Sequence, residues 1–144
     1  MNNILIDEMK KLLANSFSLY LKAQNYHWNV TGPNFAQYHD FFGDLYQEIY
    51  ESIDETAESI RKLRAFSPGS LSRFSELSQI EDELGVPTAD IMIVRLKNDN
   101  DVLIKSLYTA RAEADKSGEF GIVSYLESRL EAHEKHAWML SSFQ

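Results

Sequence analysis

The sequence contains no cysteine among its 144 residues. This excludes disulfide bonds, thiolate metal sites and cysteine nucleophiles. No apolar run approaches the ~18 residues that a membrane-spanning helix needs. The first residues, MNNILIDEMKK, lack the apolar segment and the small-residue cleavage site of a signal peptide. We therefore expect a cytoplasmic protein that has no membrane partner.

Positive charge is scarce. The chain has 14 Lys and Arg against 22 Asp and Glu, for a net charge of −8. DNA binding depends largely on neutralisation of phosphates by Lys and Arg. The small basic groups at residues 10–11 and 61–64 form no stripe, and neither end of the chain is rich in lysine. The composition therefore argues against DNA binding and favours attraction of cations.

Glycine and proline are also few, with 6 Gly and 3 Pro, and most of them mark breaks in a helical pattern. The length is that of a single domain, residues 1–144. Between the breaks, apolar residues recur at spacings of three and four, as on one face of a helix. They predict helices over residues 6–30, 35–63, 71–80, 93–114 and 123–140. The fold class is therefore all-α: a four-helix bundle with a short extra helix in the crossover between its second and third long helices.

Four potential metal ligands stand out, because imidazole and carboxylate groups together suit iron, zinc or manganese. His27 and His39 flank a Gly-Pro break, and Asp54 and Glu58 lie one helical turn apart. The fifteen residues from His39 to Asp54 span about 22 Å of helix, whereas a ligand lies about 2 Å from its ion. If all four serve one metal, a second copy must supply one end across a twofold interface.

Spacing alone leaves ordinary readings open. Asp54 and Glu58 could be a solvated acidic pair, and His27 could be a histidine packed beside Trp28. The usual di-iron bundle builds its site from Glu-x-x-His pairs inside the bundle. The residues three places before the four histidines are Gln24, Ala36, Leu130 and His133. None of these is glutamate, which argues against a di-iron carboxylate site within the bundle.

Two segments resemble the Dps family of mini-ferritins. Residues 27–35 read HWNVTGPNF and are followed at the family's distances by His39, Asp54 and Glu58; residues 134–140 read EKHAWML, like the family's last helix. The resemblance covers almost the whole chain. It implies a ferritin-like fold and a dodecameric cage for iron storage and detoxification. Such a cage oxidises Fe(II), preferentially with hydrogen peroxide, and stores the ferric mineral inside.

The resemblance also implies roles for residues. His27 and His39 of one subunit, with Asp54 and Glu58 of its twofold partner, would be the catalytic and metal ligands of a ferroxidase site. Iron is the expected metal, with zinc or manganese as alternative occupants. The family usually has a third ligand, Asp, where this chain has Gly43. Two hypotheses follow: a ferroxidase, or a non-enzymatic metal-sequestering cage in which Gly43 has impaired the centre. An Asp at position 43 is expected to restore the missing ligand.

Other polar and aromatic residues have less specific readings. His133 lies on an apolar stripe and is expected to be a hydrogen-bonded histidine of the core or of an interface. His136 is expected to be exposed or at a subunit contact. An aromatic-rich region surrounds the first half of the candidate site. It consists of Tyr26, Tyr38, Tyr46 and Tyr50. These tyrosines could simply pack, or they could form a relay that quenches radicals.

Overall fold

The computed structural model describes residues 2–144, and within that range the chain forms five helices and no strand. The helices are α1 (Asn3–Asn29), α2 (Phe35–Lys62), α3 (Leu71–Leu77), α4 (Ala89–Lys116) and α5 (Phe120–Ser141). The predicted fold class is confirmed. The four long helices begin or end up to four residues from the expected positions, and the short helix ends at Leu77 rather than at residue 80.

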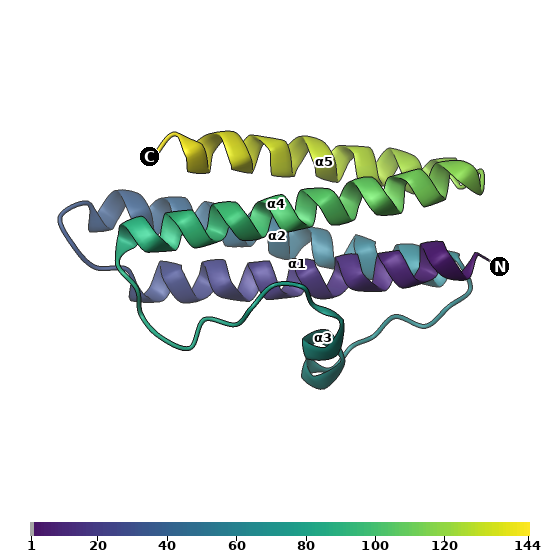
Figure 1. The fold of residues 1–144 in the computed structure, drawn as a ribbon, viewed down its shortest axis with the longest axis horizontal. Coiled ribbons are helices and arrows are strands. Elements are labelled where there is room, and N and C mark those ends of the chain that lie inside the picture. The colour runs from purple at the N-terminus through teal and green to yellow at the C-terminus, as the bar shows by residue number, and fades with distance from the viewer. Residues whose placement is uncertain (1) are drawn as a thin grey trace.

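The four long helices run side by side as a bundle (Figure 1). Helices α1 and α2 form one antiparallel pair, and α4 and α5 form the other. α1 also packs against α4, and α2 meets α5. The connection from α2 to α4 crosses the length of the bundle and contains α3, which packs on α1. This is the predicted crossover bundle.

Each long helix buries one apolar stripe in a shared core. Fully buried side chains include Leu5, Met9, Leu13, Phe42, Ile49, Leu96, Leu103 and Leu126. Removal of each such side chain from water contributes about 1.5–3 kcal/mol to the stability of the fold. Among the described residues, no helix combines the length and the apolarity that crossing a bilayer requires.

The crossover is anchored to the bundle by Glu83. Its carboxylate accepts hydrogen bonds from the Tyr26 hydroxyl of α1 at 2.6 Å and from Arg95 of α4 at 2.5 Å. The Tyr26 hydrogen bond, with that of Arg95, lowers the pKa of Glu83 to about 2. Nearby, Lys22 donates to the carbonyl oxygen of Glu81 at 2.9 Å. The loop is thereby fixed against α1, one of the two helices that present the candidate site.

Candidate metal centre

His27, near the end of α1, and His39, in the first turns of α2, are brought together by the tight turn between these helices. Gly32 adopts φ +117 in that turn, a conformation that glycine reaches without strain. The two imidazole rings stack with centroids 3.8 Å apart and an interplanar angle of 15°. The structure therefore pairs the two histidines that the sequence predicted to form one half of a site.

Reciprocal hydrogen bonds orient both rings. Nδ1 of His27 lies 2.7 Å from the carbonyl oxygen of His39, and Nδ1 of His39 lies 2.7 Å from the carbonyl oxygen of His27. A carbonyl oxygen can only accept, so each Nδ1 carries the proton. In the neutral ring, Nε2 then keeps its lone pair, which is the form that binds metal ions. Backbone acceptors of this kind fix the tautomer and orientation of metal-binding histidines.

Gly43 lies directly against the His27 ring. A Cβ placed on Gly43 would come within 3.0 Å of Cε1 and 3.1 Å of Nδ1 of His27. The glycine is therefore explained by the close approach of the ring to the α2 backbone. Position 43 therefore faces the His27 ring, and the imidazole occupies the space beside it.

Aromatic side chains border the histidine pair on two sides. The Phe35 ring stacks on His39 at 5.1 Å, and the Tyr46 ring lies 5.3 Å from that of His27. Trp28, expected beside the site, is 61% exposed in the single chain. Exposed aromatic rings beside two half-buried imidazoles form a partly apolar surface of the kind that a subunit contact would cover.

Asp54 and Glu58 lie further along α2 and are both exposed. Since His39 lies on the same helix, the rise of about 1.5 Å per residue keeps these carboxylates roughly 20 Å or more from the histidines. Within residues 2–144 of one chain, no three His, Asp or Glu side chains form a group that could hold a metal ion. The structure thus assembles the histidine half of the predicted site and holds the acidic half apart from it.

A second polar cluster links α2 to α5 and was not anticipated. Arg129 of α5 donates to both carboxylate oxygens of Glu48 of α2, at 2.5 and 3.0 Å, and Nε2 of His136 lies 2.6 Å from Glu48. Burial alone would raise the pKa of Glu48, but hydrogen bonds from His136 and Arg129 hold it well below its usual value. The expectation of an exposed His136 is wrong, because its pairing with Glu48 keeps it buried.

His133 lies in the core beside this cluster. Its Nδ1 is 2.8 Å from the amide oxygen of Asn100, and its Nε2 is 3.0 Å from Arg129, which can only donate. His133 is therefore a neutral ring protonated on Nδ1. Burial and then the adjacent Arg129 charge lower its pKa well below the usual value. The prediction of a hydrogen-bonded core histidine is confirmed.

Comparison with known proteins matches residues 6–144 to the family model described as a ferritin-like domain. The chain is 33% identical over 135 residues to the DNA protection during starvation protein of Brevibacillus brevis, covering 94% of this chain and 91% of that one. It is 37% identical over 143 residues to a low temperature-induced protein of Nostoc sp., and the match covers 96% of this chain and 78% of that protein. The crystal structure of a Dps protein from Bacillus brevis superposes with a TM-score of 0.92 at 32% identity. The superposition covers 96% of this chain and 93% of that one.

A Dps protein from Vibrio cholerae, described as a member of a broad superfamily of ferritin-like diiron-carboxylate proteins, superposes with a TM-score of 0.93 at 27% identity, covering 96% of this chain and 87% of that one.

Proposed function

Because the chain belongs to the ferritin-like family, as a mini-ferritin of the Dps type, we propose that it stores and detoxifies iron in a homo-oligomeric cage, expected to be a dodecamer. Its substrate is Fe(II), which it oxidises at sites shared between twofold-related subunits. His27 and His39 of one subunit and Asp54 and Glu58 of its partner hold the iron.

The observation that supports this proposal most strongly is the incomplete half-site. Two stacked, half-buried imidazoles keep Nδ1 on a backbone carbonyl, which leaves Nε2 as the nitrogen free to bind a metal ion. Residues 2–144 of one chain supply no third ligand to complete a site. Asp54 lies about four turns from His39 along α2 and Glu58 about five, with rotations of roughly 60° and 100°. An antiparallel α2 of a second copy would therefore bring its acids to these imidazoles.

The proposed reaction uses two Fe(II) per hydrogen peroxide. Two Fe(II), one hydrogen peroxide and two protons give two Fe(III) and two waters, so no hydroxyl radical is released. The carboxylates of Asp54 and Glu58 supply hard oxygen ligands that favour the ferric product, and Glu58 is the expected bridge between two irons. The hydrogen bonds of the stacked imidazoles already fix their tautomer and orientation, which reduces the ordering that metal binding would require.

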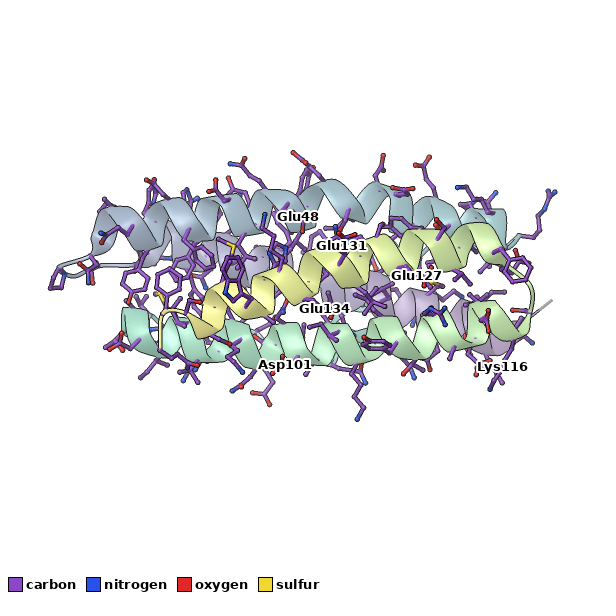
Figure 2. All side chains as sticks on the ribbon, turned by 90° about the horizontal axis from the view of Figure 1, so that it is seen from above. Glu48, Asp101, Lys116, Glu127, Glu131 and Glu134 are labelled. Carbon is purple, nitrogen blue, oxygen red and sulfur yellow. The ribbon has the colours of Figure 1, made fainter. Side chains whose placement is uncertain are left out.

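An acidic surface for the ferric product lies on α5. Glu127, Glu131 and Glu134 are exposed and spaced four and three residues apart, and they lie along α5 with Glu48 of α2 beside them (Figure 2). Such a stripe attracts and concentrates cations. We propose that this face lines the interior of the cage. Glu127 is partly neutralised by Arg111, at 3.2 Å.

A second candidate function rests on Gly43, which removes one carboxylate from the usual ligand set. With that ligand absent, the protein could sequester iron in its cage without catalysing the oxidation. Stopped-flow absorbance separates the two candidates. With a ferroxidase, peroxide oxidises Fe(II) much faster than it does in buffer without protein. With a passive cage, the two rates are similar.

Subunit complementation tests the shared site. One variant carries His27→Ala and His39→Ala, and the other carries Asp54→Ala and Glu58→Ala. Each alone should be inactive. Random co-assembly of the two should restore about a quarter of the wild-type oxidation rate, because half of the twofold pairs are mixed and each mixed pair has one intact site of two. A site within one chain predicts no recovery, and that result would refute the sharing. Asp101→Ala, an exposed acid on α4, is the control for loss of surface charge.

A further inference from the structure

Three tyrosines form a continuous line of rings that begins at the histidine half-site. Tyr46 lies 5.3 Å from the His27 ring, Tyr20 lies 6.1 Å from Tyr46, and Tyr50 lies 4.9 Å from Tyr20, all between centroids. These separations are those of aromatic rings in contact. Tyr20 and Tyr46 are half-buried, and Tyr50 is 56% exposed. The line therefore leads from a candidate iron ligand to the surface of the subunit.

Two of these tyrosines share one face of α2 with the candidate ligands. His39, Tyr46, Tyr50 and Asp54 follow one another at spacings of seven, four and four residues, which spreads them over about 80° of the helix surface. The tyrosines lie between the histidine end and the acidic end. If an antiparallel α2 completes the site, the tyrosines of both chains lie between the two sites of the pair.

An iron site with few ligands would need a second electron donor for the reduction of hydrogen peroxide. Hydrogen peroxide needs two electrons for reduction to water, and one Fe(II) supplies only one. A pair of irons meets this need, but Gly43 leaves the second iron position one carboxylate short. A site that holds a single Fe(II) would release hydroxyl radical unless another electron donor lies close by.

On the basis of the ferroxidase function proposed above, we propose that Tyr46, Tyr20 and Tyr50 donate this second electron. Fe(II), tyrosine, hydrogen peroxide and one proton give Fe(III), a tyrosyl radical and two waters. The oxidised state passes from Tyr46 to Tyr20 and Tyr50. A further Fe(II) and a proton then restore the tyrosine and give a second Fe(III). The overall stoichiometry remains two Fe(II) per peroxide.

The phenol groups suit this role better than a purely structural one. The Tyr26 hydroxyl is committed to Glu83, whereas those of Tyr20, Tyr46 and Tyr50 have no hydrogen-bond partner within residues 2–144. Burial, followed by proximity to Tyr50 and Tyr46, raises the pKa of Tyr20. The ring is therefore a neutral phenol at physiological pH, and its oxidation releases a proton that the peroxide reduction consumes.

Freeze-quench electron paramagnetic resonance of the assembled protein tests the relay. The protein is loaded with one Fe(II) per chain, mixed with hydrogen peroxide and frozen, and Fe(II) oxidation is followed by absorbance in the same samples. The wild type should show the resonance signal of a tyrosyl radical. That signal should become narrower when the protein is produced with ring-deuterated tyrosine. Tyr46→Phe, which keeps the ring, should lose most of this signal and release more hydroxyl radical to a spin trap. Tyr108→Phe, an exposed tyrosine on α4, should match the wild type.

The outcomes separate the relay from the function on which it rests. If peroxide oxidises Fe(II) but no tyrosyl signal forms, or the signal and the spin-trap yield are unchanged in Tyr46→Phe, the relay is wrong and the ferroxidase proposal stands. A radical located on tryptophan also overturns the relay. If the wild type does not oxidise Fe(II) with peroxide, the proposed function fails, and the relay fails with it.

Discussion

At residue scale, the half-site depends on how closely the His27 ring approaches the backbone of α2. The ring fits because Gly43 has no side chain, and the two Nδ1 hydrogen bonds then hold both imidazoles in one orientation. The glycine that lacks the carboxylate usual in the family therefore also makes room for the His27 ring, a proposed ligand. This coupling means that a substitution at position 43 changes both the space beside His27 and the ligand set.

A pair of variants separates these two effects. Gly43→Ala adds a Cβ about 3 Å from the His27 ring and should displace it, weakening metal binding several-fold. Gly43→Asp adds the same Cβ together with a carboxylate, and should bind more iron and oxidise it faster than Gly43→Ala. Titration with Fe(II) in the absence of oxygen measures iron binding, and stopped-flow absorbance after addition of peroxide measures the oxidation rate. Equal behaviour of the two variants would show that a carboxylate at position 43 does not reach the metal.

At the scale of helices, α2 and α5 are held together by charged groups rather than by apolar packing alone. Arg129 and His136 of α5 both pair with the carboxylate of Glu48 on α2, and His133 is buried beside them. Such a pairing is costly to break, because removal of one partner leaves a buried charge uncompensated. It also makes the contact between these helices sensitive to pH.

The first prediction at this scale concerns the loss of stability at acidic pH. His133 is neutral in the folded protein because its pKa lies well below 6.5, so below that pH only the unfolded chain binds its proton. Stability should fall as the pH drops from 7 to 5, with His133 contributing up to about 1.4 kcal/mol per pH unit. Urea unfolding measured at several pH values tests this. His133→Gln should show a shallower dependence across that window, and an equal slope would contradict the assignment.

The second prediction at this scale concerns the hydrogen bond that anchors the crossover to α1. Tyr26→Phe keeps the buried ring but removes the hydrogen bond to the ionised Glu83, and should lower the free energy of unfolding by about 1.5–3 kcal/mol. Tyr108→Phe is the matched control, because Tyr108 is exposed, and should change stability by less than about 0.5 kcal/mol. If chemical denaturation shows equal stability for both variants, Glu83 is not the anchor of the crossover.

At the scale of the whole molecule, the charge balance argues against a nucleic-acid role for the assembly. In the proposed cage each subunit carries a net charge of −8, so its surface gains little counterion release from phosphates. The names of relatives that refer to DNA protection do not imply that this chain binds DNA, because protection of DNA does not require contact with it. Removal of Fe(II) and peroxide would protect DNA equally well.

The protein should accordingly leave plasmid DNA unretarded in a gel shift at physiological salt. Fusion of a lysine-rich extension to the N-terminus provides the positive control, since it adds the phosphate contacts that the native chain lacks. Tight binding by the unmodified protein without added divalent cations would contradict the prediction.

The sequence by itself determined the elements and the candidate ligands. Apolar spacing with Gly and Pro breaks located all five helices, because these signals are local in the chain. The resemblance at residues 27–35 supplied His27, His39, Asp54 and Glu58 as a set. Helix geometry alone then required a second copy if they share a metal.

Only the tertiary structure decided how these residues meet their neighbours. The approach of His27 to Gly43 depends on the turn angle between α1 and α2. The pairing of Glu48 with Arg129 and His136 joins positions 81 and 88 residues apart, and it contradicts the alternative in which His136 is exposed. Such contacts are set by the register and rotation of packed helices, and a difference of one residue, about 100° of rotation, would redirect each side chain.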